Sequence, residues 1–380
     1  MRQVGRLGRL LAFEEAAYGD TPALLATMAV RHLNFTAEYQ PRNRVPSEEK
    51  KATRGRKVRF DRARTAGFDL TAILRPSGTI GTIPEAHTLL RHGFGAAIVG
   101  TLNGTVAAAA STTVFTLQAG EGASVVAGEF VSVRRAANGN VPEARRVLSK
   151  AGDELTLNAP LGGIPAANDT VKAGVTYRFG ALAKSIGFAH YLTDLKRTVK
   201  GGLPNELTLS FERNKEPEFR LAGPAQQAPR GAAALPGFTT VGSQNPPSGL
   251  AGSGLIVNGV ARKFMKCEVS IDLGRELISE NYGTSMAEAF DEPDFRDVTF
   301  SFERRADTDY TLYDLAEDGA LFDLLLQTGL TEGNIVAIHA PKAEIEHVPQ
   351  LPDDNGVLTH SFAGVLNENA GDDEVALGLL

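Results

Sequence analysis

The sequence predicts a mainly β protein of the α+β class, with two sheet-containing domains in tandem, each with one helix, and a small inserted β module. Three observations support this prediction. Segments in which apolar and polar residues alternate recur along the chain, as in strands with one buried and one wetted face. Only two segments have a helical pattern. Strands, long polar loops and helices follow one another in the same order in both halves.

The first half is expected to begin with an N-terminal arm (1–25), followed by a discontinuous domain (26–105 and 177–228). The segment TIPEAHTLLRHGFG predicts a helix that starts near Pro84 and stops at Gly93. Four short apolar-rich segments predict a small antiparallel barrel or sandwich inserted at 106–176. The predicted strands of the domain itself cover residues 32–39, 56–63, 67–76, 205–213 and 217–223.

A segment rich in Ala, Gly, Pro and Ser (229–254) is expected to be a linker between the halves. In the second domain (255–380), a helix is predicted near 311–328. Its apolar residues can share one face, and Gly329 follows as a stop. Those residues are Leu315, Leu321, Phe322, Leu325 and Leu326. The predicted strands cover 266–274, 297–305, 343–348 and 357–366. The repeated order favours a tandem duplication, and two unrelated α+β domains that converged on one order are the alternative.

The composition is that of an ordinary globular protein. The 380 residues include 42 % hydrophobic and 22 % charged residues. A single cysteine, Cys267, excludes an intramolecular disulfide and a multi-cysteine metal site, and we expect it to be a small buried residue. We expect a soluble, unsecreted protein, because Glu14 and Glu15 interrupt the N-terminal segment and the uncharged stretch 96–115 is only weakly apolar.

No candidate for catalysis, cofactor binding or metal binding emerges from the motifs. The chain has no GxxxxGK[ST], HExxH, GxSxG or CxxC motif, and its seven histidines are scattered. The acidic segments DEPD (291–294) and PDDNG (352–356) do not complete a calcium-binding loop. The basic segment 42–64 interleaves acids and has few aromatic residues, which disfavours direct nucleic-acid recognition. A hydrolase with unrecognised paired carboxylates stays open as a minor alternative.

Charge is distributed unevenly along the chain. Residues 1–66 contain 14 Lys/Arg and 7 Asp/Glu, whereas residues 281–380 contain 4 Lys/Arg and 21 Asp/Glu. Such a chain can associate head to tail, because the basic region of one copy meets the acidic region of the next. Two unrelated solvated surfaces are the alternative interpretation.

The first half resembles the tail tube proteins (major tail proteins) of long, non-contractile-tailed bacteriophages, the siphophages. That family has a Glu-x-x-Tyr-Gly opening, a strand, a loop with Arg and Pro, a strand ending in a Gly-rich turn, and a Pro-led helix closing on Gly. The matching segments are Glu15–Gly19, Leu33–Tyr39, Arg42–Arg56, Phe68–Pro76 and Pro84–Gly95. The closing strands at 205–223 and the inserted module are also similar, so the resemblance covers about residues 1–228.

The resemblance implies that the two tandem domains are tail-tube-type β-sandwich or barrel domains, each with a flanking helix. It also implies a structural virion protein without enzymatic activity or cofactor, made in the host cytoplasm. Its copies would form stacked rings whose lumen passes DNA without sequence-specific binding. The family's rings are six-fold, so two tube domains per chain imply a homotrimer with pseudo-six-fold symmetry. The implied partners are the chain itself and other tail proteins such as the tape measure and terminator, with no membrane. The alternative is a tail-associated terminator, decoration or minor tail protein that does not polymerise.

Two long loops connect this resemblance with the charge pattern. We expect the basic loop of the first domain and the acidic loop of the second to cross the interface between stacked rings. Exposed ion pairs contribute on the order of 0–1 kcal/mol each, so many copies must act together. The candidate residues are Arg42, Arg44, Lys50, Lys51, Arg54, Arg56 and Lys57 in the first loop, and Glu276, Glu280, Glu288, Asp291, Glu292 and Asp294 in the second.

Overall fold

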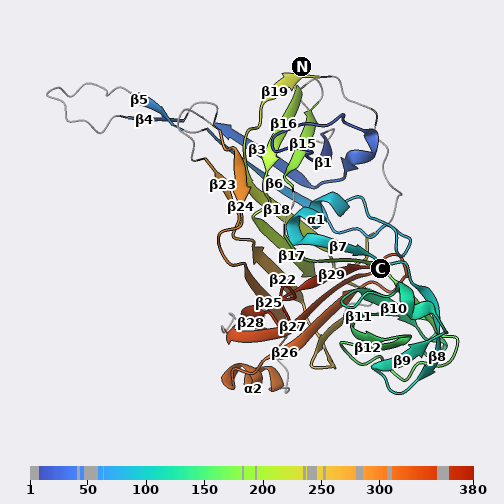
Figure 1. Cartoon of the computed structure of the whole chain (residues 1–380). Helices are drawn as coiled ribbons and strands as arrows, with labels where there is room; N and C mark the ends of the chain where they lie inside the picture. Colours follow the sequence, from blue (N-terminus) through green and yellow to red (C-terminus); the bar gives the residue numbers. More distant parts are fainter. Residues whose placement is uncertain are drawn as a thin grey trace.

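The computed structural model describes residues 8–40, 43–46, 59–62, 64–181, 184–192, 195–233, 237, 246–250, 254–279, 286–305, 310–348 and 359–380. These residues form mainly β-strands, as predicted, with two α-helices and a few 3-10 turns. Figure 1 shows a long sheet that runs through both halves of the chain, with shorter sheets beside it. No helix in these ranges is long and apolar enough to cross a membrane.

The long sheet has eight antiparallel strands in the order β27-β28-β25-β22-β17-β18-β6-β3. In β17, Leu207, Leu209 and Phe211 are buried while the residues between them are more exposed, because alternate side chains of a strand point to opposite faces. The eight strands are β3 (Asn34–Gln40), β6 (Thr65–Ile73), β17 (Glu206–Glu212), β18 (Glu218–Ala225), β22 (Lys266–Asp272), β25 (Asp297–Arg305), β27 (Val336–His347) and β28 (Thr359–Asn367).

Two four-stranded units with the same topology make up this sheet. Each unit has a first strand (β3 or β22), its neighbour (β6 or β25) and a closing pair (β17–β18 or β27–β28). The units join where β22 pairs with β17 along the whole of Glu206–Glu212. The tandem arrangement expected from the sequence is therefore present in the fold.

A second layer covers the apolar face of the long sheet. One part passes through β27 in the order β7-β14-β29-β27-β26-β20-β21, and the other is a sheet in the order β19-β16-β15-β1-β2. Phe188 on β15 lies with its ring centroid 4.8 Å from that of Phe68 on β6, so the layers share a core. The strands are β1 (Arg9–Glu14), β2 (Ala29–Val30), β7 (Gly95–Val99), β14 (Val175–Phe179), β15 (Ile186–Leu192), β16 (Leu195–Gly202), β19 (Arg230–Ala232), β20 (Gly254–Val257), β21 (Val260–Arg262), β26 (Phe322–Thr328) and β29 (Ala376–Leu379).

Several of these elements bear on the expected domain boundaries. Part of the segment expected to be an N-terminal arm forms β1, between β15 and β2. Part of the expected linker forms β19 at a sheet edge. Strand β29 pairs with β14 of the first half and β27 of the second, so it holds the two halves together. Helix α1 (His87–Phe94) packs on β17 and β18, where Gly93 leaves room for Leu207 and Leu221.

The inserted module is a closed barrel with its own apolar core, in the order β10-β11-β12-β9-β8-β13. It docks on the second half, because the Gln327 side chain accepts a hydrogen bond from the Ala144 N–H (2.8 Å) and donates one to the Pro142 carbonyl (3.0 Å). Gly378 leaves space for the Phe130 ring at the same junction. The strands are β8 (Asn103–Ala109), β9 (Val114–Leu117), β10 (Phe130–Arg134), β11 (Pro142–Ala151), β12 (Glu154–Leu157) and β13 (Thr170–Ala173).

Each unit carries a hairpin at the long loop after its first strand. These are β4 (Asn43–Pro46) with β5 (Arg59–Arg62), and β23 (Glu276–Ile278) with β24 (Ala289–Asp291). Strand pairing places Ala66 opposite Ala225, and Glu206 opposite Asp272, so both hairpins leave the same end of the long sheet. Figure 1 shows β4 and β5 projecting away from the body of the molecule.

The helix predicted near 311–328 is wrong in its second part. Helix α2 (Thr311–Glu317) is followed by Gly319 in the left-handed region (φ 60°), and residues 322–328 form β26. Leu325 packs toward the barrel and Leu326 toward the main core, so both faces of β26 are buried. A strand buried on both faces has a continuous apolar sequence, which resembles one face of a helix.

Candidate assembly surfaces

The face of the long sheet opposite the core carries small polar and acidic side chains. Thr208, Ser270 and Thr299 lie side by side on β17, β22 and β25. The acidic residues on this face include Glu38, Asp69, Glu206, Glu212, Glu218, Glu268, Asp272, Asp297, Glu303 and Glu344. The basic residues include Arg220, Lys266, Lys342 and, at a strand end, Arg305. Arg220 is paired with Asp69 (2.7 Å) and Glu206 (2.9 Å). The described part of this face is therefore polar and negatively charged.

One end of the long sheet is an open edge at β3, and the other end is open only along the last residues of β27, Glu344–His347. Among the described strands, β3 pairs with β6 alone, and the Arg197 guanidinium donates to the Ala37 carbonyl. At the other end, β26 pairs with β27 only as far as Ala343, whereas β28 continues along β27 to His347. An edge of unpaired N–H and C=O groups can accept a further strand. The sheet can therefore be extended along β3 at one end and along the last residues of β27 at the other.

A polar sheet face with open strand edges suits a protein that assembles through its strands. The model of the phage tail tube protein family matches residues 5–364. This chain belongs to that family. None of the curated proteins compared with the chain matches it.

The family match extends over both units, further than the resemblance seen in residues 1–228. The chain is thus a structural tail tube protein and a virion component. Membership of this family implies that the protein self-associates and contacts other phage tail proteins.

The predicted inter-ring residues of this tail tube protein lie at the following positions in the structure. Glu276, Glu288, Asp291, Glu292 and Asp294 are exposed and gather around the β23–β24 hairpin, where Glu276 lies opposite Asp291. For Arg44, only the backbone in β4 is described. The residues Arg42, Lys50, Lys51, Arg54, Arg56, Lys57 and Glu280 lie outside the described part of the chain.

Arg275 anchors the acidic hairpin, and the sequence analysis did not single it out. Its side chain is buried and donates to the Glu292 carboxylate (2.6 Å) and to the carbonyls of His92 (2.8 Å) and Pro204 (3.1 Å). Burial lowers the pKa of the guanidinium, and the Glu292 carboxylate opposes this effect. The His92 carbonyl belongs to the C-terminal turn of α1, where a cation is favourable. Arg275 thus fixes the second-half hairpin to the first half, and Glu292 is already engaged within the chain.

The buried titratable groups have packing roles in the described structure. The ring Nε2 of His339 lies 2.5 Å from Asp323 Oδ2, and its Nδ1 lies 3.3 Å from Arg146 Nη1, at the junction of barrel and sandwich. Burial lowers the pKa of His339, and it lowers the pKa of His92 to about 4. Cys267 is buried, as predicted, and burial raises the pKa of its thiol to about 12. The described residues include no group of three His, Cys, Asp or Glu side chains placed to hold a metal ion.

Proposed function

We propose that three copies of this chain close into a ring, in which β3 of one copy pairs with the free edge of β27 in the next. The observation that supports this proposal is the β22–β17 junction within the chain. There, the first strand of the second unit pairs with the closing pair of the first unit. β3 is the first strand of its own unit, as β22 is. Repeating this junction between copies removes the open edges and gives a closed pseudo-six-fold ring.

The lumen of this ring is the proposed conduit for DNA ejection. Three copies of eight strands make a barrel of 24 strands. At about 4.8 Å between strands and a tilt of about 40°, its diameter is roughly 48 Å between backbones, which is wider than a DNA double helix. The polar, acidic face lines the lumen, since the second layer covers the other face. Its negative charge repels DNA phosphates and favours passage without specific binding.

Stacked rings form the tube in this proposal, with the tape measure and terminator as partners. Both hairpins leave the same end of the sheet, so the basic and acidic loops reach the same neighbouring ring side by side. The candidate loop residues remain inter-ring residues in the proposal. Because the two loops share one end, the acidic loop requires a positive partner at the opposite end of the sheet in the next ring.

Ring closure is tested by light-scattering mass and negative-stain electron microscopy of the full chain at rising concentration, with hydrogen exchange on the same samples. We expect rings of three chains with a central hole, and slower amide exchange in β3 on assembly, while the central strand β17 serves as an internal control. Rings of six chains would contradict the two-unit closure. A monomer at every concentration would overturn the proposal and favour a tail-associated protein that does not polymerise.

A further inference from the structure

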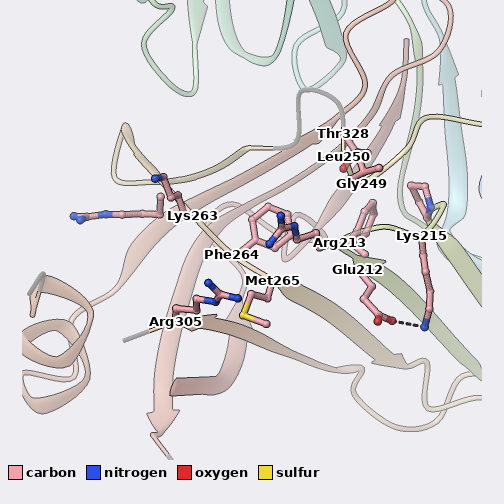
Figure 2. Close-up of a pocket in the computed structure, with 13 residues that line it drawn as sticks. Glu212, Arg213, Lys215, Gly249, Leu250, Lys263, Phe264, Met265, Arg305 and Thr328 are labelled. Atoms are coloured by element: carbon pink, nitrogen blue, oxygen red, sulfur yellow. Dashed lines mark hydrogen bonds and ion pairs between the residues drawn. The ribbon is translucent and has the colours of Figure 1, made fainter. Parts of the chain in front are cut away.

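A basic cleft with an apolar floor lies at the end of the long sheet away from the hairpins. It has a volume of about 630 Å³, and Leu250, Phe264 and Met265 supply apolar surface. Figure 2 shows cationic side chains around these residues. The charged lining residues are Arg213, Lys215, Arg262, Lys263 and Arg305, with Glu212 as the acid, paired with Lys215 at 2.6 Å. This basic cleft suits an anionic segment that also carries an apolar side chain.

The opposite end of the same sheet carries a segment of that character. The sequence DEPDF (291–295), here called the acidic tip, holds Phe295 with its side chain 100 % exposed. Asp291 and Asp294 on either side of Pro293 are also exposed. Single exposed apolar side chains are common on proteins. Phe295 differs from such side chains because carboxylates flank it and a rigid backbone segment supports it.

The acidic tip is held in place by close backbone packing. Gly274 has a positive φ (62°), and a Cβ at this position would lie 2.8 Å from the Asp294 carbonyl oxygen and 3.0 Å from that of Phe295. Only glycine therefore allows this approach without strain. The next residue is the buried Arg275, whose bond to Glu292 holds the tip from its other side. Phe295 is thus presented to solvent by a fixed segment.

The tip and the cleft lie at opposite ends of the same two strands. β22 starts beside Met265 in the cleft and ends at Asp272, just before Gly274. β25 starts at Asp297, two residues after Phe295, and ends at Arg305 in the cleft. Nine residues of β-strand span about 30 Å. A head-to-tail displacement along these strands therefore brings the tip of one copy toward the cleft of another.

We propose that the acidic tip of each chain docks in the basic cleft of a second copy in the adjacent ring. Phe295 packs over Phe264 and Met265, and the carboxylates of Asp291 and Asp294 face the cations at the rim. This inference rests on the proposed function and adds the surfaces that join stacked rings. A second copy is the occupant because every ring carries tips and clefts in equal number, at opposite ends.

The test uses full-length chains analysed by sedimentation velocity and electron microscopy. The first variant is Phe295→Ser, matched by Ile164→Ser, which alters a side chain 60 % exposed on the barrel. Because Phe295 makes no contribution to the core, its loss should leave rings intact and raise the concentration needed for stacking by about tenfold. The control should stack as the wild-type chain does. Added salt should weaken stacking more than ring closure, since exposed charges are screened.

Charge reversal provides a second, independent readout. A tip variant (Asp291→Lys with Asp294→Lys) and a cleft variant (Lys263→Glu with Arg305→Glu) should each form rings that do not stack alone. Mixed together, they should build tubes, because each basic tip then meets an acidic cleft and each acidic tip meets a basic cleft. Wild-type tubes from every variant, or no tubes from the mixture, would overturn this inference. Failure of the wild-type chain to form rings would instead refute the proposed function.

Discussion

Glu129 offers a quantitative test of the electrostatics in the inserted barrel. It precedes β10 at the junction with the second half, and it is 0 % exposed. Neither oxygen of its carboxylate has a hydrogen-bond partner among the described residues. Burial raises the pKa of Glu129 to about 7, and the nearby Val126 backbone and the positive charge of Lys150 offset this only in part. Substitution of Glu129 by Gln removes the ionisable group while keeping its shape.

The size of the effect follows from the two pKa values. An acid whose pKa rises on folding destabilises the folded state once it ionises, so stability falls as pH rises from 4.5 through about 7. That difference corresponds to about 3 kcal/mol when the group is fully ionised in both states. At pH 5 the loss is about 1 kcal/mol, because the folded-state carboxyl is still protonated. Relative to the wild-type chain, Glu129→Gln should therefore gain about 2 kcal/mol more at pH 9 than at pH 5.

Urea unfolding followed by circular dichroism at both pH values measures this gain. Glu154→Gln is the matched control, because Glu154 is an exposed carboxylate in β12 of the same barrel. The control should show no comparable change between pH 5 and pH 9. Equal stability differences for Glu129→Gln at the two pH values would refute the assignment of a buried, destabilising carboxylate.

Two further substitutions probe the contacts that hold the halves together. Arg275→Met leaves Glu292 and two backbone carbonyls without their cation and should cost about 3–5 kcal/mol in thermal unfolding, against at most about 1 kcal/mol for the exposed Arg220→Met. Equal losses would show that Arg275 is no anchor. Leu377→Ala removes a fully buried side chain from β29 and should cost about 2–5 kcal/mol, whereas Leu148→Ala, 52 % exposed, should cost less than about 1 kcal/mol. A loss as small as that of the control would show that β29 does not join the halves.

The strands of the long sheet were predictable because one of their faces is wetted. β25, for example, has the boundaries expected from DVTFSFERR, in which Val298, Phe300 and Phe302 alternate with polar residues. Such alternation survives in the sequence only where one side of the strand faces solvent or a lumen. The alternation that made these strands predictable also identifies the polar face that we assign to the lumen.

Strands buried on both faces were not predictable in this way. β1, β15 and β29 have almost no exposed positions, so their sequences RLLAFE, IGFAHYL and ALGL do not alternate. The second part of the predicted helix failed for the same reason, since β26 lies inside the second layer. The spacing of apolar residues shows which face of a strand is buried. A strand buried on both faces has no such spacing.

The assembly surfaces show a similar limit. The acidic character of the second loop could be predicted from its composition. The exposure of Phe295 could not, because it depends on the close backbone approach at Gly274, which has no sequence motif. The basic cleft combines residues from segments near 213, 250, 264 and 305, which strand pairing and a backbone hydrogen bond between Gly249 and Lys215 bring together. Charge in a continuous segment can be predicted from sequence, whereas a cleft built from separate segments requires the fold.

Because the chain holds two units of the same topology, it can carry different surfaces in its two halves. In a ring built from a single-domain subunit, every position must present the same loop and the same sheet end. Here the second-half hairpin is tied down by Arg275, while the first-half hairpin projects from the body. In the trimer that we propose, three acidic tips lie at one opening and three basic clefts at the other. In that proposal, stacking is restricted to rotations compatible with three-fold symmetry, whereas six identical surfaces would also allow the rotations between them.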